Sequence, residues 1–280
     1  MSNVLENISS FREDAMRRYW IAAAVLGLLL NGCAGVQTAP TQEEKQALAP
    51  TGKLRVGFIS GSPIHATKDA ASGEFKGVAV DLGKELARRI GVPFEPVAYS
   101  SVPALITGAK TGQWDVATMG ISTERALLVD FTAPYMEVEF SYLVPKGSPI
   151  STLSDVDRPG IRIGVVEKSS PDVYLTGTLR SATLVRAPTI AGMVESLRAG
   201  RADILFGTKA GMLSQAEKLA GSRVLEGRSG GEETGIAIPK RRDSSAAYVR
   251  KFVESAKSEG LVKAAIERAA LRGVVVAPLK

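Results

Sequence analysis

GQWDVATMG at Gly112–Gly120 and GRADILFGT at Gly200–Thr208 share one pattern: a glycine, two residues, an aspartate and an apolar run of strand length. A further strand-like run precedes each of them, LRVGF at Leu54–Phe58 and IRIGVV at Ile161–Val166. The same elements thus recur twice in the same order. This recurrence predicts two α/β lobes. The alternative is one doubly wound domain in which the shared pattern is coincidence.

Helical spacing fills the gaps between these strands. In DLGKELARRIG, Leu82, Leu86 and Ile90 fall on one stripe and Gly91 stops the helix. TIAGMVESLRAG repeats this arrangement with Ile190, Met193, Val194 and Leu197 on one face and Gly200 as the stop. Alternating strands and helices predict mostly parallel sheets covered by helices.

Two extended segments connect the predicted lobes, EVEFSYLVPKG at Glu137–Gly147 and EETGIAIPK at Glu232–Lys240. Two helices follow, Ser244–Ser258 and Leu261–Leu271, which can return to the first lobe. Two crossings make a two-strand hinge, and the cleft between the lobes is the expected ligand site. We therefore predict lobe 1 at residues 53–143 plus 236–280, and lobe 2 at residues 144–235.

Composition narrows the class of protein. With 280 residues and 45% hydrophobic content, the chain can bury large cores, so neither a disordered nor a fibrous protein fits. The net charge of +6 comes from scattered residues without a basic run among aromatics, which gives no case for nucleic acid. One histidine, one cysteine and no glycine-rich phosphate loop argue against a metal site, a cofactor or a Cys-His catalytic pair.

The beginning of the chain has the form of a secretory signal. MRRYWIAAAVLGLLLNGCAG at Met16–Gly35 carries two arginines and then an apolar stretch too short for a transmembrane helix. Gly32 and Cys33 resemble a bacterial lipobox, which implies cleavage before Cys33 and lipidation of its thiol. The alternative is an incidental free cysteine. We predict a signal peptide at residues 1–32, with Met16 as a candidate start, and a flexible polar tether at 33–52.

Five motifs in sequence order, GEFKGVAVDLGKELARRIG, GISTERALLVDFTAPY, IRIGVVEKSS, LRAGRADILFG and GIAIPK, give the chain a family resemblance. From Lys53 to about Leu271 it resembles the family 3 periplasmic solute-binding proteins, the amino-acid-binding kind that serves ABC transporters. The resemblance implies a bilobal type II fold that closes on a small solute. It also implies a monomer, lipid-anchored on the periplasmic or cell-surface side, that works with a permease in the inner membrane.

The resemblance further implies that Arg125, in the STER segment, grips the carboxylate of the ligand. Independently, a guanidinium fork matches carboxylate oxygens, whereas the alternative is a solvated surface charge. Ser170 is predicted to cap the next helix, with Pro171 at its first position and Asp172 in its first turn. Free backbone N–H groups there, with the hydroxyls of Ser169 and Ser170, would form an anion seat. Capping without ligand binding is the alternative.

Several positions depart from the family pattern. Thr208 stands where a carboxylate usually holds the ammonium of the ligand, Ser62 replaces an aromatic, and Gly120 replaces a hydroxyl. Lys168 stands where glycine is more usual, and Thr118 completes the candidate set. Since a buried ammonium without a carboxylate is costly, we expect an organic acid or another anion held by Arg125, Ser169, Ser170 and Lys168. Alternatively, Glu167 or Glu232 supplies the missing carboxylate.

Other residues receive structural interpretations. Trp114 is expected to pack, and Asp115 and Asp203 to have the same structural role in both lobes. His65 is expected to be a surface residue, and the alternative is that its loop lines the cleft and the histidine contacts the ligand. For Phe58, two interpretations are open: it packs under the first loop of the cleft, or it contacts the ligand.

No nucleophile or general base stands out, so a binding protein is expected rather than an enzyme. The alternatives on the same fold are a periplasmic cyclohexadienyl-type dehydratase, which would need a general acid in the cleft, and a ligand-binding sensor subunit.

Overall fold

The computed structural model describes residues 39–240 and 242–280. The predicted signal peptide at residues 1–32, the lipidation of Cys33 and the first part of the tether lie outside the described residues and stay predictions. Residues 39–280 form one structural unit. Within the described part of the chain, no helix is both long enough and apolar enough to cross a membrane.

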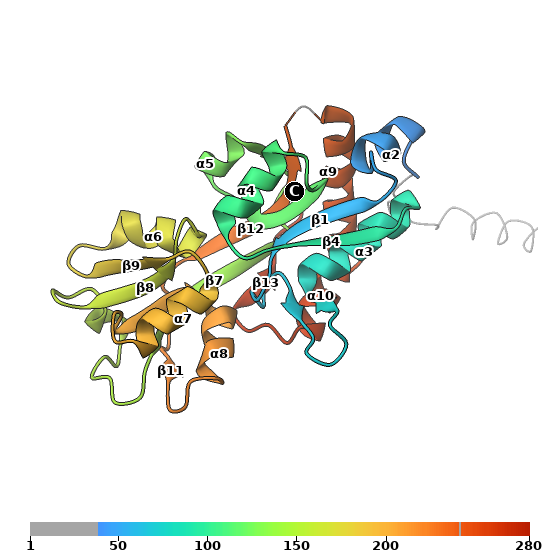
Figure 1. Ribbon diagram of the computed structural model, residues 1–280. Helices are drawn as coiled ribbons and strands as arrows, with labels where there is room; N and C mark the ends of the chain where they lie inside the picture. Colours follow the sequence, from blue (N-terminus) through green and yellow to red (C-terminus); the bar gives the residue numbers. More distant parts are fainter. Residues whose placement is uncertain (1–38, 241) are drawn as a thin grey trace, which may run out of the picture. The chain divides into compact units, whose positions relative to one another are not determined.

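The elements divide between two halves of this unit (Figure 1). Lobe 1 contains helices α2 (Gln42–Leu48), α3 (Val78–Ile90), α4 (Val102–Lys110), α5 (Thr123–Ala126), α9 (Asp243–Ser258) and α10 (Leu261–Arg268). Its strands are β1 (Leu54–Ile59), β2 (Thr67–Lys68), β3 (Phe75–Lys76), β4 (Phe94–Tyr99), β5 (Val116–Gly120), β6 (Val129–Phe131), β12 (Gly231–Pro239), β13 (Val274–Val276) and part of β7 (Met136–Val144). Lobe 2 contains η1 (Leu153–Asp155), α6 (Ser170–Thr178), α7 (Ile190–Arg198), α8 (Lys209–Ala216), β8 (Arg162–Val166), β9 (Thr183–Ala187), β10 (Ile204–Thr208), β11 (Arg223–Val224) and the rest of β7.

The main sheet runs in the order β4-β1-β5-β12-β7-β10-β8-β9. Strand β1 pairs in parallel with β4 and β5, and β8 pairs in parallel with β9 and β10. The long strands β7 and β12 are antiparallel to their neighbours. The predicted fold class, two mostly parallel α/β lobes joined through extended strands, is confirmed.

The chain passes between the lobes at two adjacent points. Met136–Glu139 of β7 pair with β12 in lobe 1, whereas Phe140–Leu143 pair with β10 in lobe 2. Gly230 lies beside the crossing, where only glycine fits. Its φ of +111° is a conformation that other residues rarely adopt, and an added Cβ would lie 2.6 Å from the Tyr174 ring. We therefore propose lobe boundaries near residues 139/140 and 230/231, a few residues before the predicted positions.

The aspartates of the two sequence repeats make the same contacts in both lobes. Asp115 Oδ2 accepts from the backbone N–H and the Nε–H of Arg55, both at 3.0 Å. Asp203 Oδ2 accepts from the same two groups of Arg162, at 2.8 and 3.1 Å. Each pair ties two parallel strands together where they begin. The predicted structural role of both aspartates is confirmed.

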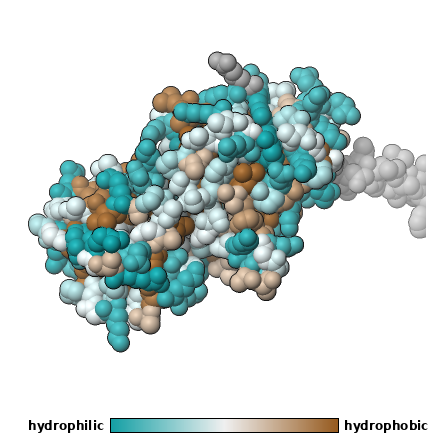
Figure 2. Space-filling view, in the orientation of Figure 1, coloured by the Kyte–Doolittle hydropathy of each residue, from teal (hydrophilic) through white to brown (hydrophobic). Residues whose placement is uncertain are grey.

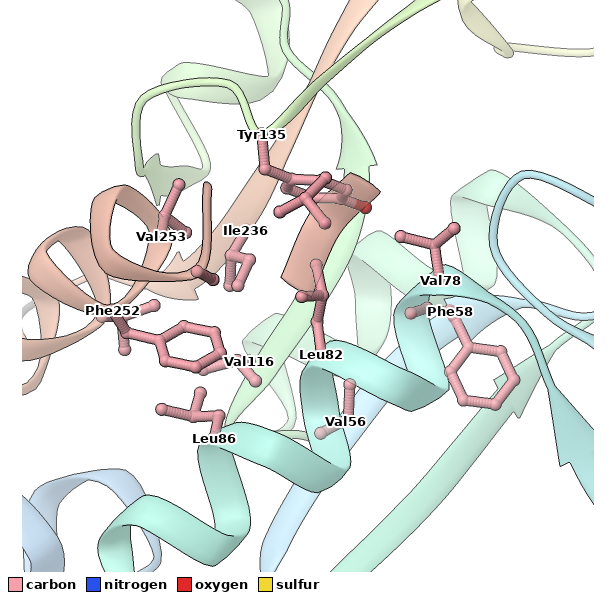
Figure 3. Close-up of a cluster of buried hydrophobic side chains, with 14 of the residues drawn as sticks. Val56, Phe58, Val78, Leu82, Leu86, Val116, Tyr135, Ile236, Phe252 and Val253 are labelled. Atoms are coloured by element: carbon pink, nitrogen blue, oxygen red, sulfur yellow. The ribbon is translucent and has the colours of Figure 1, made fainter. Parts of the chain in front are cut away.

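Apolar side chains from α3, β1, β5, β12 and α9 meet in the largest core of lobe 1 (Figure 3). Leu82 and Leu86 of the predicted stripe are buried there, and Phe58 packs edge-to-face on Phe75 with ring centroids 5.2 Å apart. Trp114 is fully buried in a neighbouring cluster and donates to the carbonyl of Leu105 at 2.8 Å. Phe58 and Trp114 therefore both pack in the core of lobe 1, as expected for Trp114 and as one of the two interpretations of Phe58.

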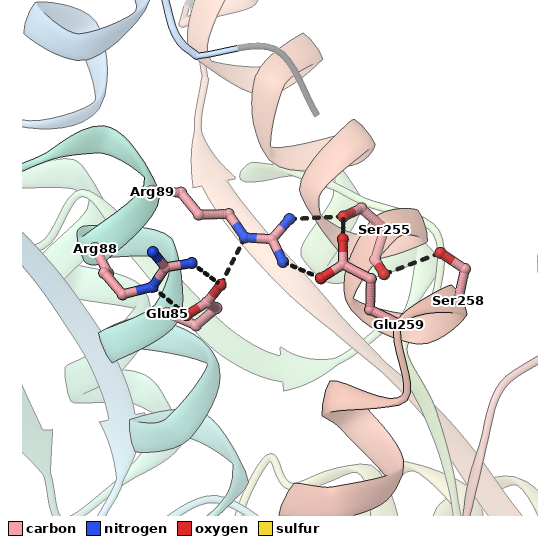
Figure 4. A network of polar contacts seen from close by, with 6 residues as sticks. All are labelled: Glu85, Arg88, Arg89, Ser255, Ser258 and Glu259. Carbon is pink, nitrogen blue, oxygen red and sulfur yellow. Dashed lines mark hydrogen bonds and ion pairs between the residues drawn. The ribbon is translucent and has the colours of Figure 1, made fainter. Parts of the chain in front are cut away.

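Helix α9 returns to lobe 1 and is held there by a polar network (Figure 4). Arg89 of α3 bonds Glu85 on its own helix and reaches Ser255 and Glu259 at 2.6 Å each. Because α9 follows the second crossing, this network ties the returning chain to α3 of lobe 1.

The predicted tether is wrong in its second part, because residues 42–48 form helix α2. Thr41 and Glu44 make a reciprocal capping box at its start, and Leu48 is fully buried against the core of lobe 1. The polar composition of this segment suggested a flexible tether, but the burial of Leu48 attaches it to lobe 1.

On the face seen in Figure 2, hydrophobic residues form small groups among hydrophilic ones. Among residues 39–240 and 242–280, the exposed large hydrophobic side chains are Leu127, Leu128, Val173, Val275 and Leu279. Apolar surface is therefore buried mainly within the two lobes.

The paired aspartates allow a matched stability test. Asp115→Asn should lower the free energy of unfolding by about 3 kcal/mol, because the buried carboxylate serves both Arg55 and Arg242. Asp203→Asn should cost only about 1 kcal/mol, since the side chains of Asp203 and Arg162 are 38% and 43% exposed. Urea unfolding followed by circular dichroism measures both, and equal losses would contradict the assignment.

Candidate functional site

A cavity of about 110 Å³ lies between the two lobes and is lined from both. One water needs only about 10–15 Å³ on this scale, so the cavity has room for a small solute. Six of the sequence-predicted residues line it: Ser62, Gly120, Arg125, Ser169, Ser170 and Thr208. The structure thus brings most of the candidate set to one place.

Arg125 extends from the short helix α5 of lobe 1 toward lobe 2. Its Nη1 donates to Gly120 O at 2.8 Å and to Ser170 Oγ at 3.0 Å, and its Nη2 donates to Lys168 O at 2.9 Å. Ser122 caps α5 by accepting from the backbone N–H of Arg125, which fixes the start of the side chain. The guanidinium therefore bridges the lobes through neutral acceptors.

The charge of Arg125 has no anionic partner at contact distance. The residue is only 8% exposed, and among the described residues no carboxylate oxygen lies within 4.0 Å of its guanidinium. Burial lowers the pKa of Arg125, while the charges of Glu232 and Glu124 act in the opposite direction. An arginine nevertheless stays protonated in proteins. The cleft therefore holds a buried cation with two N–H donors that have no partner among the described residues.

Ser169, not Ser170, is the N-cap of α6, so the predicted cap was wrong by one residue. Ser169 Oγ accepts from Asp172 N, which leaves the hydroxyl of Ser170 free to accept from Arg125. Adjacent serines have the same capping propensity, so sequence alone could not separate them.

The predicted anion seat at the start of α6 has fewer free backbone N–H groups than expected. Asp172 Oδ2 accepts from Lys168 N, and the backbone N–H groups of Ser169, Asp172 and Val173 also have partners. Of the first helical residues within the described structure, Ser170 keeps a backbone N–H without a partner and Pro171 has none to offer. One backbone donor beside the Arg125 fork is therefore available.

Glu232 lines the same cavity from the beginning of β12. Burial raises its pKa, opposed by a hydrogen bond from Ser170 and by the positive charge of Arg125. Its carboxylate lies directly over Gly120, where an added Cβ would be 1.9 Å from Oε2. Sequence reasoning proposed Glu232 as one of two substitutes for the missing carboxylate, and Glu167, the other, is not among the lining residues.

His65 is buried, not a surface residue, and this expectation was wrong. It is 7% exposed, lines the cavity, and its Nδ1 lies 3.1 Å from Thr118 Oγ1. Burial and the charge of Arg125 lower the pKa of His65 to about 4, so the ring is neutral at pH 7. The spacing between His65 and Thr118 in the chain gave no signal for this contact.

Two candidates stand outside the lining. Thr118 is 2% exposed and supports His65 from behind the cavity. Lys168 is exposed and contributes only its backbone, with φ at +57°. Thr208 lines the cavity and caps α8, since its hydroxyl accepts from Gly211 N at 3.2 Å.

Most of the remaining lining is apolar and was not foreseen. It comprises Ile59, Pro63, Ile64, Val102, Leu105, Met119, Val166, Ile190, Met193, Phe206 and Met212. These residues come from both lobes. Pro63 and Ile64 lie in the loop between β1 and β2, and the others belong to helices and strands, where an apolar pattern predicts burial alone. Among the described residues there is no cluster of His, Cys, Asp and Glu that could hold a metal ion.

The buried histidine makes stability depend on pH. An unfolded histidine titrates near 6.5 and folded His65 near 4, so the unfolded chain binds the proton first and stability falls as pH falls. From pH 7 to pH 5 the loss from this residue should be about 2 kcal/mol. His65 is the one histidine of the chain, so the difference between wild type and His65→Gln in urea unfolding isolates it. Parallel pH profiles for the two proteins would contradict this.

Comparisons with known proteins agree with this architecture. The glutamine-binding protein GlnH of an ABC transporter of Bacillus subtilis is 25% identical over 245 residues, covering 85% of this chain and 89% of the relative. The lysine/arginine/ornithine-binding periplasmic protein of Escherichia coli is 29% identical, covering 83% and 92%.

A solved structure is similar over a comparable length. The crystal structure of the ancestral amino acid-binding protein AncCDT-1, a precursor of cyclohexadienyl dehydratase, matches with a TM-score of 0.69 at 25% identity. The match covers 80% of this chain and 97% of that chain. Residues 54–269 also match the family of bacterial extracellular solute-binding proteins, family 3. Since this match spans most of the chain, the protein belongs to family 3 of the bacterial extracellular solute-binding proteins.

Proposed function

We propose that the protein is the extracytoplasmic component of an ABC importer and binds a small carboxylate-bearing solute in the interlobe cleft. The observation that carries the proposal is the 8%-exposed guanidinium of Arg125, which has no carboxylate partner at contact distance in the described structure. An unpaired buried charge costs several kcal/mol, and an anionic ligand removes that cost. The free N–H groups of Arg125 and Ser170 are the donors for it.

The mechanism is hinge closure. Arg125 belongs to lobe 1, and Ser169 and Ser170 to lobe 2, so a carboxylate between them contacts both lobes only when the cleft is closed. A ligand that binds one state better shifts the population toward it. The closed state is then what a membrane permease recognises.

A lipid anchor at Cys33 would keep the protein at the membrane on the periplasmic or cell-surface side. The signal pattern supports this localisation. A sensor subunit would use the same fold and the same cleft, and a permease encoded beside the gene would favour transport.

One observation favours the dehydratase alternative. Glu232 lines the cleft with a raised pKa and could serve as the general acid that such an enzyme needs. Incubation of the purified protein with prephenate or arogenate tests this directly. Turnover that Glu232→Gln abolishes would establish the enzyme, and absence of turnover would exclude it for these substrates.

Replacement of Arg125 tests the binding proposal. A thermal-shift screen over amino acids, organic acids and inorganic anions first identifies the ligand, because binding raises the melting temperature. By calorimetry, Arg125→Ala should then weaken binding by about 2–5 kcal/mol, and Arg125→Lys should also weaken it because the planar fork is lost. Arg250→Lys, on the exposed face of α9, is the control. Unchanged affinity in both Arg125 variants would refute the proposal.

A further inference from the structure

The one histidine of the chain has a fixed position in the wall of the cavity. The backbone N–H of His65 donates to Ser62 O at 3.0 Å, and its carbonyl accepts from Ala79 N, in the first turn of α3, at 3.1 Å. Gly77 packs against the same carbonyl so closely that an added Cβ would lie 2.5 Å from it. Contacts to its own loop and to the start of α3 therefore fix the backbone at His65.

The two ring nitrogens of His65 have different surroundings. Nδ1 lies 3.1 Å from Thr118 Oγ1, and Thr118 does not line the cavity, so this edge of the ring points away from the cavity. Nε2 lies on the other edge and makes no hydrogen bond within the described part of the chain. The ring therefore presents Nε2 to the cavity.

Thr118 determines which ring nitrogen carries the proton. Its hydroxyl is buried, and among residues 39–240 and 242–280 His65 Nδ1 is the one acceptor found for it. A buried hydroxyl proton needs an acceptor, so Thr118 donates to Nδ1. His65 is neutral at pH 7, because its pKa lies at about 4. A neutral imidazole has a single N–H group, which is then at Nε2.

Tyr135 favours the same direction of donation. Its hydroxyl is buried without a well-aligned hydrogen-bond partner among the described residues, and burial raises its pKa, so it stays protonated at pH 7. The Thr118 hydroxyl opposes this rise in pKa, which places it near Tyr135 Oη. The phenol proton is therefore directed at the Thr118 oxygen, and the proton of Thr118 is left for His65.

We infer that His65 is a specificity-determining residue, whose Nε2–H donates to a second oxygen of the solute outside the carboxylate at Arg125. The inference rests on the proposed function and deepens it, because it gives the solute a second acceptor oxygen. Since the donor is neutral, a carbonyl, hydroxyl or carboxylate oxygen can accept from it.

A second oxygen is required because the carboxylate has other donors. The free N–H groups of Arg125 and Ser170 are those proposed for it. His65 is a further donor, in a lining that is mostly apolar. A buried donor left without an acceptor costs free energy, so a hydrocarbon beside Nε2 is disfavoured and an oxygen is favoured.

The tautomer can be observed directly, because the chain has one histidine. In protein labelled with nitrogen-15 histidine at pH 7, long-range proton–nitrogen NMR distinguishes the protonated from the unprotonated ring nitrogen. We expect the proton of His65 on Nε2. A ring protonated on Nδ1 overturns the inference, because Nε2 would then accept instead of donating.

Ligand pairs of equal shape test the second oxygen. Calorimetry compares succinate and 4-oxopentanoate with 4-methylpentanoate, L-asparagine with L-leucine, and L-glutamine with L-homoleucine. In each pair a group that contains a C=O is exchanged for a hydrocarbon group of the same shape. We expect at least one oxygen-bearing ligand to bind about 10-fold tighter than its hydrocarbon counterpart, because the latter leaves Nε2–H unpaired. Equal or weaker binding of every oxygen-bearing ligand overturns the inference.

Two variants separate the roles of the two ring nitrogens. The amide of His65→Asn takes the place of Nδ1 and can accept from Thr118, but it has no donor at the position of Nε2. The longer amide of His65→Gln reaches the position of Nε2 and can donate there. The affinity ratio within a pair should fall by about 10-fold in His65→Asn and be retained in part in His65→Gln.

An affinity ratio unchanged by His65→Asn contradicts the assignment, and so does a loss in His65→Gln as complete as in His65→Asn. The NMR spectrum and the ligand pairs use the wild-type protein, so those two tests do not depend on the folding of either variant.

Failure of the inference differs from failure of the proposed function. If the members of each pair bind equally and Arg125→Ala weakens both, the carboxylate clamp stands and the role of His65 falls. If no ligand of the panel binds, the inference is overturned, and the broader ligand screen decides the proposed function.

Discussion

A buried guanidinium that spans two lobes is the constraint on which the cleft depends. Arg125 comes from a four-residue helix of lobe 1, yet two of its three hydrogen bonds end on lobe 2. All three acceptors are neutral, so they orient the side chain without cancelling its charge. Under the proposed function, this arrangement keeps the cation available for an anion and makes the contact between the lobes part of the binding site.

The scaffold behind this contact is repeated, whereas the site is not. Asp115 and Asp203 hold the starts of their strands by the same two contacts, and this pairing stiffens each lobe separately. At the other ends of those strands the lobes differ: β5 ends at Gly120 and β10 ends at Thr208. Unlike residues therefore stand at corresponding positions on the two sides of the cleft, as the proposed binding of an asymmetric solute requires.

Local pattern in the sequence predicted the lobes, the hinge strands, the stripe on α3 and the position of Arg125 in the cleft. These features depend on periodicity and on motif order, which a single chain displays. The sequence did not predict that His65 is buried against Thr118, nor that Leu48 anchors α2, since each depends on a partner remote in the chain. The cap at Ser169 was missed for a different reason, because two adjacent serines are equivalent until the helix geometry distinguishes them.

The departures from the family pattern at Gly120 and Thr208 can be understood together through the position of Glu232. Considered separately, the glycine removes a polar ligand contact and Thr208 removes a carboxylate, which together favoured an anionic solute. In space, the absence of a side chain at position 120 is what allows Glu232 to reach the cavity. A carboxylate therefore still lines the cavity, and it comes from β12, a strand that begins at the crossing between the lobes. The Glu232 carboxylate lies beside Gly120 and Ser170, two of the three groups that accept hydrogen bonds from Arg125.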